Sequence, residues 1–181
     1  MSGDSENKSR ADLFVEEVFA RKENDKAYRA RLRAAVNPLR EWNAWGDIEQ
    51  YVNLQDASRR RLFLTIGAAI AWSNETQNGD SSLGKALQKS WQDKGTDKAS
   101  PSMQRLRRLL ACTSSDSVCQ VIRPLLKLIS SRQAAKLNYA ELLKQLLIFD
   151  QYSDSVKARW AQDYFSADKA EEESEGKEEQ A

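Results

Sequence analysis

The chain has 181 residues, of which 40% are apolar and 30% charged, with a formal net charge of +1, as is ordinary for a soluble protein of one or two domains. It has no histidine, only two cysteines and no apolar run near the roughly 20 residues that span a bilayer, which excludes the commonest general base, a disulfide framework and a membrane helix. We therefore expect a cytoplasmic protein that is not an enzyme, contacts no membrane and holds no metal or other cofactor.

The first half of the chain is predicted to be helical, because proline and glycine are few and no stretch alternates with period two. Residues 1–10 are expected to form a disordered tail, and residues 11–75 an N-terminal helical domain. Asp56 is a candidate N-cap for a long helix that runs to about Ser73. Trp42 and Trp45 belong to an aromatic cluster that we assign to the core.

Residues 76–80 (Thr-Gln-Asn-Gly-Asp) are polar and contain Asn-Gly, so they are predicted to link two domains. Residues 81–166 would then form a C-terminal helical domain. Ser81 or Ser82, and Ser100 before Pro101, are start signals for two of its helices. A third helix should be kinked or split by Pro124, and the last should run from about Ser153 to Phe165. The fold class expected is all-α, with two small helical-bundle domains.

Residues 167–181 are predicted to form an acidic disordered tail, since seven acids and two bases follow Ala167 without apolar periodicity. Residues 1–167 carry 26 basic and 20 acidic side chains, a net charge of +6. The near-neutral total therefore hides a basic folded part.

The basic charge concentrates in residues 85–136, which hold eleven Lys and Arg residues against three Asp. At about 100° per residue, Arg105 and Arg107 flank an apolar stripe and Arg108 points away from it. On the next helix Arg123 and Lys127 lie one turn apart. Packing of the two stripes could place Arg105 and Arg123 on one basic groove, where a polyanion would offset the repulsion between like charges.

Five short motifs occur in a characteristic order: LRAA (32–35), SLGKAL (82–87), RLRRLL (105–110), IRPLL (122–126) and VKARW (156–160). Together they resemble the CasB family, the small subunit of the type I-E CRISPR Cascade complex, over roughly residues 11–166. The resemblance implies an all-α, non-catalytic protein that stabilises guide RNA–target DNA pairing and the displaced non-target strand. Its partners would be guide RNA, both DNA strands, other Cascade subunits and a second copy of itself.

The resemblance places Arg33, Arg105, Arg123 and Lys157 on basic positions of the family pattern, and Lys85 where arginine is usual. Ala34 replaces an arginine that is often found there. The full set of candidate nucleic-acid-binding residues combines these positions with the basic segment: Arg33, Lys85, Lys89, Arg105, Arg107, Arg108, Arg123, Lys127, Arg132 and Lys157.

Two other functions are compatible with the same pattern. An all-α scaffold could use its basic face to bind acidic protein partners, and a helix-turn-helix protein could bind DNA, although no turn has the short glycine-containing form. Four aromatic residues could also stack on bases: Trp42, Trp72, Trp91 and Tyr152. Most aromatic residues at helical spacing are core.

Overall fold

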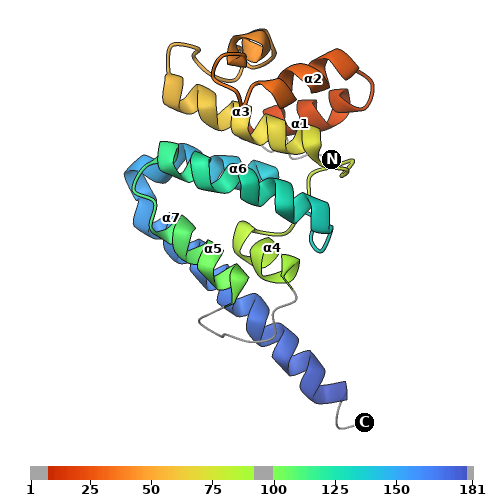
Figure 1. Cartoon of the computed structure of the whole chain (residues 1–181), viewed down its shortest axis with the longest axis vertical. Coiled ribbons are helices and arrows are strands. Elements are labelled where there is room, and N and C mark those ends of the chain that lie inside the picture. Colours follow the sequence, from red (N-terminus) through yellow and green to blue (C-terminus); the bar gives the residue numbers. More distant parts are fainter. Residues whose placement is uncertain (1–7, 92–99, 179–181) are drawn as a thin grey trace, which may run out of the picture. The chain divides into compact units, whose positions relative to one another are not determined.

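The structure, a computed structural model, describes residues 8–91 and 100–178. Its regular elements are helices throughout (Figure 1), and the extended pairing in the described part is limited to one isolated bridge between Ser81 and Leu137. The all-α class is confirmed. No helix among these residues is long and apolar enough to cross a membrane.

The chain divides into two compact units. Unit 1 comprises the chain up to Asn78 together with Tyr139–Leu147, and unit 2 comprises Gly79–Asn138 and the chain from Ile148 onward. The first boundary lies inside the predicted linker 76–80. The return of residues 139–147 to unit 1 differs from the contiguous division that the sequence predicts, because those residues pack on α1: Lys144 pairs with Asp12 at 2.7 Å.

Unit 1 is built around α3 (Ala57–Trp72), on which α1 (Arg10–Lys22) and α2 (Lys26–Ala34) pack. A 3-10 helix, η1 (Glu41–Asp47), contacts α2. Every residue of α3 from Leu62 to Ala71 is buried, so this part of the helix is covered on all sides. Asp56 accepts a hydrogen bond from the Arg59 N–H at 3.0 Å and caps α3, as predicted.

The last part of the segment predicted to be a linker, from Gly79 onward, is held by backbone pairing within unit 2. Gly79 N–H donates to Leu137 O at 3.0 Å, Ser81 N–H to Lys136 O at 3.0 Å and Asn138 N–H to Ser81 O at 2.8 Å. A Cβ on Gly79 would lie 2.1 Å from the Lys136 carbonyl oxygen, so only glycine allows this approach. The pairing partner lies more than fifty positions away, which is why the local sequence resembles a free loop.

Unit 2 contains α4 (Leu83–Ser90), α5 (Pro101–Leu110) and α6 (Ser115–Arg132), which contact one another in pairs. Ser82, Ser100 and Ser114 cap these helices, so the first two start signals are confirmed. Pro124 lies inside a continuous α6, so the predicted split does not occur. Proline lacks an N–H and its ring crowds the carbonyl group four residues earlier, but the buried residues on both sides of Pro124 hold α6 together.

The long helix α7 (Tyr139–Glu178) contributes its first nine residues to unit 1 and the rest to unit 2. Tyr152 has non-helical backbone angles (φ −128°, ψ 37°), which places an interruption next to the predicted start at Ser153. The helix continues through residues 167–178, for which the sequence predicts disorder. Glu, Ala and Lys have high helix propensity, so this composition also favours a helix.

Candidate nucleic-acid interface

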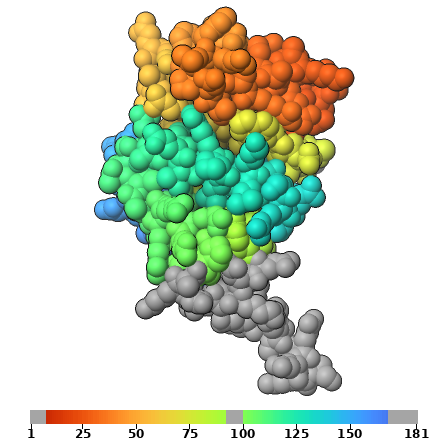
Figure 2. All heavy atoms as spheres, viewed as in Figure 1, coloured from red at the N-terminus to blue at the C-terminus, as the bar shows by residue number. Residues whose placement is uncertain are grey.

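The predicted basic residues are concentrated in one unit. Nine of the ten lie in unit 2, and Arg33 is in unit 1. Figure 2 shows the outer surfaces of α5 and α6, in green and teal, side by side on one face of unit 2. Eight of the eleven basic residues in segment 85–136 therefore lie on three neighbouring helices, α4, α5 and α6.

An open groove of about 430 Å³ lies between α5 and α6. Arg105 and Arg108 of α5 line it, and its remaining lining residues come from α6: Gln120, Val121, Pro124, Leu125 and Leu128. Two guanidinium groups therefore border a mostly apolar floor. The helical stripes suggest that Arg105 and Arg123 share a groove, but Arg123 is not among the lining residues. Arg105 shares this groove with Arg108. Arg123 is half-buried and Lys127 exposed on α6.

A second group of basic side chains surrounds Trp91, the residue that ends α4. The guanidinium carbon of Arg105 lies 4.3 Å from the centre of the Trp91 ring, and that of Arg132 lies 4.8 Å from it. Arg132 also donates from Nη1 to the Ser90 carbonyl oxygen at 2.8 Å. Residues 105 and 132 are on different helices, and only the fold brings them to one indole.

The other candidates in unit 2 differ in how they are held. Lys85 and Lys89 are exposed one turn apart on α4, and Arg107 is exposed on α5. Lys157 of α7 is half-buried, with its ammonium nitrogen 5.7 Å from the centre of the Phe149 ring. Such side chains suit contacts with phosphates, which need charge more than exact geometry.

Arg33 has a clear structural role. Its Nε donates to the Ala71 carbonyl oxygen at 2.8 Å, and Arg29 Nε donates to the same oxygen at 2.9 Å. The Lys22 ammonium donates nearby to Ile70 O at 3.3 Å and to Ser73 O at 3.1 Å. Three cations thus gather at the C-terminal end of α3, where the helix dipole favours positive charge.

Burial shifts the pKa of two of these cations. Desolvation lowers the pKa of the Lys22 ammonium, which is only 1% exposed, and also lowers the pKa of the Arg33 guanidinium. Both cations donate hydrogen bonds to backbone carbonyl oxygens at the C-terminal end of α3.

The four candidate stacking residues are separated by their exposure. Trp42 is 63% exposed and Tyr152 is 51% exposed, whereas Trp91 is 5% exposed and Trp72 is half-buried. The prediction that Trp42 belongs to the core is wrong, because η1 turns this side chain outward. Trp91 is too covered to stack on a base.

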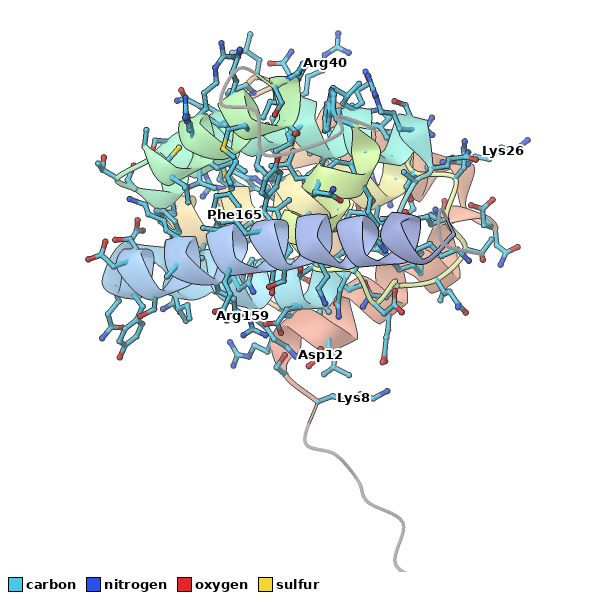
Figure 3. The ribbon with its side chains drawn as sticks, turned by 90° about the horizontal axis from the view of Figure 1, so that it is seen from below. Lys8, Asp12, Lys26, Arg40, Arg159 and Phe165 are labelled. Carbon is cyan, nitrogen blue, oxygen red and sulfur yellow. The ribbon has the colours of Figure 1, made fainter. Side chains whose placement is uncertain are left out.

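Sequence reasoning missed a shallow depression on unit 1. It measures about 470 Å³ and is lined by residues of α2, η1 and the connection between them: Ala30, Arg31, Ala34, Leu39, Arg40, Trp42 and Asn43. Leu39 is 83% exposed. Lys26 and Arg40 extend outward from the ribbon (Figure 3). Pro38 signals a break in the helix at this place in the sequence, but a proline does not report which side chains are exposed.

No group of three or more Asp, Glu or Cys side chains that could hold a metal ion occurs among the side chains that the structure describes, those of residues 8–91 and 100–167. Cys112 and Cys119 are buried as free thiols. The groove and the Trp91 group hold arginine and apolar side chains, a set that binds anions by charge and supplies no acid–base pair.

The fold and the surface of unit 2 define a helical protein with one basic face. Residues 28–165 match the family described as CRISPR-associated protein Cse2, and the chain belongs to this family, also called CasB. The comparison with curated proteins found no match.

Solved structures agree with this family assignment. A chain of a CRISPR RNA-guided surveillance complex is 26% identical with a TM-score of 0.74, the match covering 91% of this chain and 96% of that one. A chain of such a complex in a pre-nicking state is 24% identical, with a TM-score of 0.77 and coverage of 91% and 97%. CasB of M. ruber is 22% identical with a TM-score of 0.69 and coverage of 91% and 97%. The last two support the fold alone.

Proposed function

We propose that the chain is the non-catalytic, nucleic-acid-binding small subunit of a type I-E Cascade surveillance ribonucleoprotein in antiviral defence. It would stabilise guide RNA–target DNA pairing and the displaced non-target strand, beside other Cascade subunits and a second copy of itself. The family membership and the likeness to a surveillance-complex chain support the assembly.

The α5–α6 groove carries the proposal of nucleic-acid binding. Arg105 and Arg108 face an apolar floor of Val121, Pro124 and Leu125, so one groove offers charge for a phosphate and a surface for an unpaired base. Such contacts are independent of base sequence. Binding that does not depend on base sequence fits a surveillance complex, in which guide–target pairing supplies the sequence specificity.

The decisive experiment reconstitutes the complex with and without this chain. Opening of the target duplex is measured by a fluorescent base analogue in the non-target strand. We expect less opening without the chain, and the Arg105→Ala/Arg108→Ala variant should assemble normally yet restore opening poorly. Normal opening by this variant in an assembled complex would contradict a nucleic-acid role for the groove.

A second candidate, an all-α scaffold that binds acidic protein partners, is favoured by the depression on unit 1. Exposed Leu39 and Trp42 beside Arg40 match the composition of protein interfaces, in which Trp and Arg are enriched. Salt separates the two functions: binding to nucleic acid gives a steep, linear loss of log affinity with log salt, because counterions are released.

A further inference from the structure

Trp91 brings two arginines of the described part of the chain to one ring. Both guanidinium carbons lie over its ring, at 4.3 Å for Arg105 and 4.8 Å for Arg132. Within residues 8–91 and 100–167, no carboxylate forms an ion pair with either arginine. Two like charges on one aromatic ring repel each other, and an anion bound between them would turn that repulsion into attraction.

Each arginine is also oriented by a backbone carbonyl group. Arg105 Nη1 donates to Pro101 O at 2.9 Å, and Arg132 Nη1 donates to Ser90 O at 2.8 Å. A guanidinium has five N–H donors, so most donors on each arginine are left for a ligand. Carbonyl and indole contacts restrict the rotamers of both side chains before a ligand arrives, which reduces the entropy lost on binding.

Arg105 belongs both to this pair and to the α5–α6 groove. A strand whose phosphates contact Arg105 and Arg132 would therefore lie next to the apolar floor formed by Val121, Pro124 and Leu125. An unpaired base can be placed on that floor, whereas the bases of a duplex are stacked inside it. The ligand class is accordingly single-stranded phosphodiester backbone.

We propose that Trp91 is a positioning residue that holds Arg105 and Arg132 as a clamp for single-stranded nucleic acid. The clamp rests on the proposed nucleic-acid-binding function and adds to it a specific pair of contacts and the side chain that organises them. Trp91 itself is 5% exposed, so it acts through the arginines.

The test uses the full-length chain and a labelled oligothymidine strand, titrated by fluorescence anisotropy at several salt concentrations. Arg105→Ala and Arg132→Ala should each reduce the magnitude of the log–log salt slope by about 0.7, the value for one phosphate contact on a single strand. Arg40→Ala, which removes the same charge from unit 1, is the matched control and should leave the slope unchanged. The wild-type chain should bind the single strand more tightly than a duplex of equal length.

Trp91→Leu should weaken binding roughly threefold to tenfold in the wild-type background. It should have no further effect when Arg105 and Arg132 are both alanine, because nothing is then left to position. Equal losses in the two backgrounds would overturn the proposal, since Trp91 would then act independently of the arginines. Trp91→Phe keeps an aromatic ring and should retain most of the affinity and the salt slope.

Circular dichroism and thermal melts check that each variant is folded. If Trp91→Leu does not fold, the two arginines alone decide the question: alanine at both positions should reduce the magnitude of the salt slope by about 1.4, and a slope equal to that of Arg40→Ala would overturn the clamp. The proposed function fails separately, if the wild-type chain shows no salt-dependent binding to any nucleic acid. The clamp fails alone if the wild-type chain binds but Arg105→Ala and Arg132→Ala behave like Arg40→Ala.

Discussion

Arg33 Nε donates a hydrogen bond to the carbonyl oxygen of Ala71 at 2.8 Å, at the C-terminal end of the most buried helix of unit 1. Arg29 contacts the same oxygen at 2.9 Å. The family resemblance points to Arg33 as a nucleic-acid contact, and the structure shows that it caps α3. A basic residue in a family motif can thus contribute to the packing of the unit in which it lies.

The first prediction concerns this cap. Arg33→Ala should lower the free energy of unfolding by about 1 kcal/mol, since Arg29 still occupies the shared carbonyl oxygen. The double variant Arg29→Ala/Arg33→Ala should lose more than the two single losses combined, because the carbonyl is then left without either donor. Urea titrations give these values. A loss of nucleic-acid affinity with unchanged stability would instead make Arg33 a ligand contact.

The second prediction compares two buried tyrosines. The Tyr28 hydroxyl is buried and has no hydrogen-bond partner among the described residues, whereas the Tyr164 hydroxyl lies 2.6 Å from Ser102 Oγ. Tyr28→Phe should therefore be neutral or stabilise the protein by up to about 1 kcal/mol, and Tyr164→Phe should destabilise it by about 1 kcal/mol. Thermal melts of both variants measure the difference. Destabilisation by Tyr28→Phe would show that its hydroxyl has a partner, such as a buried water.

The third prediction concerns alkaline pH. Burial, the largest cause in each case, raises the pKa of Tyr28, Tyr51 and Tyr139 above the ordinary value of 10.0. Above about pH 10 the unfolded chain releases protons that the folded chain retains, so stability present at lower pH is lost as pH rises further.

Lys22 acts in the opposite direction, because its pKa is lowered from 10.5 by burial and the unfolded chain binds more protons below that value. Three tyrosines should outweigh one lysine. The melting temperature should therefore fall above pH 10, and Tyr139→Phe should make the fall shallower. A melting temperature that stays constant or rises between pH 10 and 11 would contradict this balance.

The fourth prediction concerns Gly84 in the SLGKAL motif. A Cβ at this position would lie 2.2 Å from the Trp160 carbonyl oxygen and 2.7 Å from the Tyr164 nitrogen, so α4 and α7 meet at backbone distance. Gly84→Ala should destabilise unit 2 by about 3 kcal/mol or more, despite the better helix propensity of alanine. Gly46→Ala is the control, because a Cβ there meets nothing within 4 Å. Equal melting temperatures for the two variants would disprove the close approach.

The fifth prediction concerns the acidic C-terminal segment. The seven acids after Ala167 should compete with nucleic acid for basic side chains, so truncation after this residue should tighten nonspecific DNA binding at low salt, roughly twofold to fivefold. Replacement of the acids by glutamine at constant length should give the same gain. The helical circular dichroism signal per folded residue should be retained. Loss of folding in the truncated chain would show that the segment stabilises unit 2.

The sequence alone determined the helical class and most helix starts, because caps and apolar periodicity act within a few residues. Asp56, Ser82 and Ser100 each form the predicted cap. The basic character of the C-terminal half is likewise a matter of composition. The order of five short motifs, which the sequence shows directly, was sufficient to indicate the family. The match over residues 28–165 confirms it.

Only the tertiary structure decided which charges meet. Arg105 and Arg132 are 27 positions apart and share one indole, and Arg105 borders the groove with Arg108 while Arg123 does not line it. Helical periodicity places a side chain on a face, but the partner of that face depends on packing between distant segments. The pairing of Ser81 with Leu137 and the capping of α3 by Arg33 depend on the same long-range packing, which no local pattern contains.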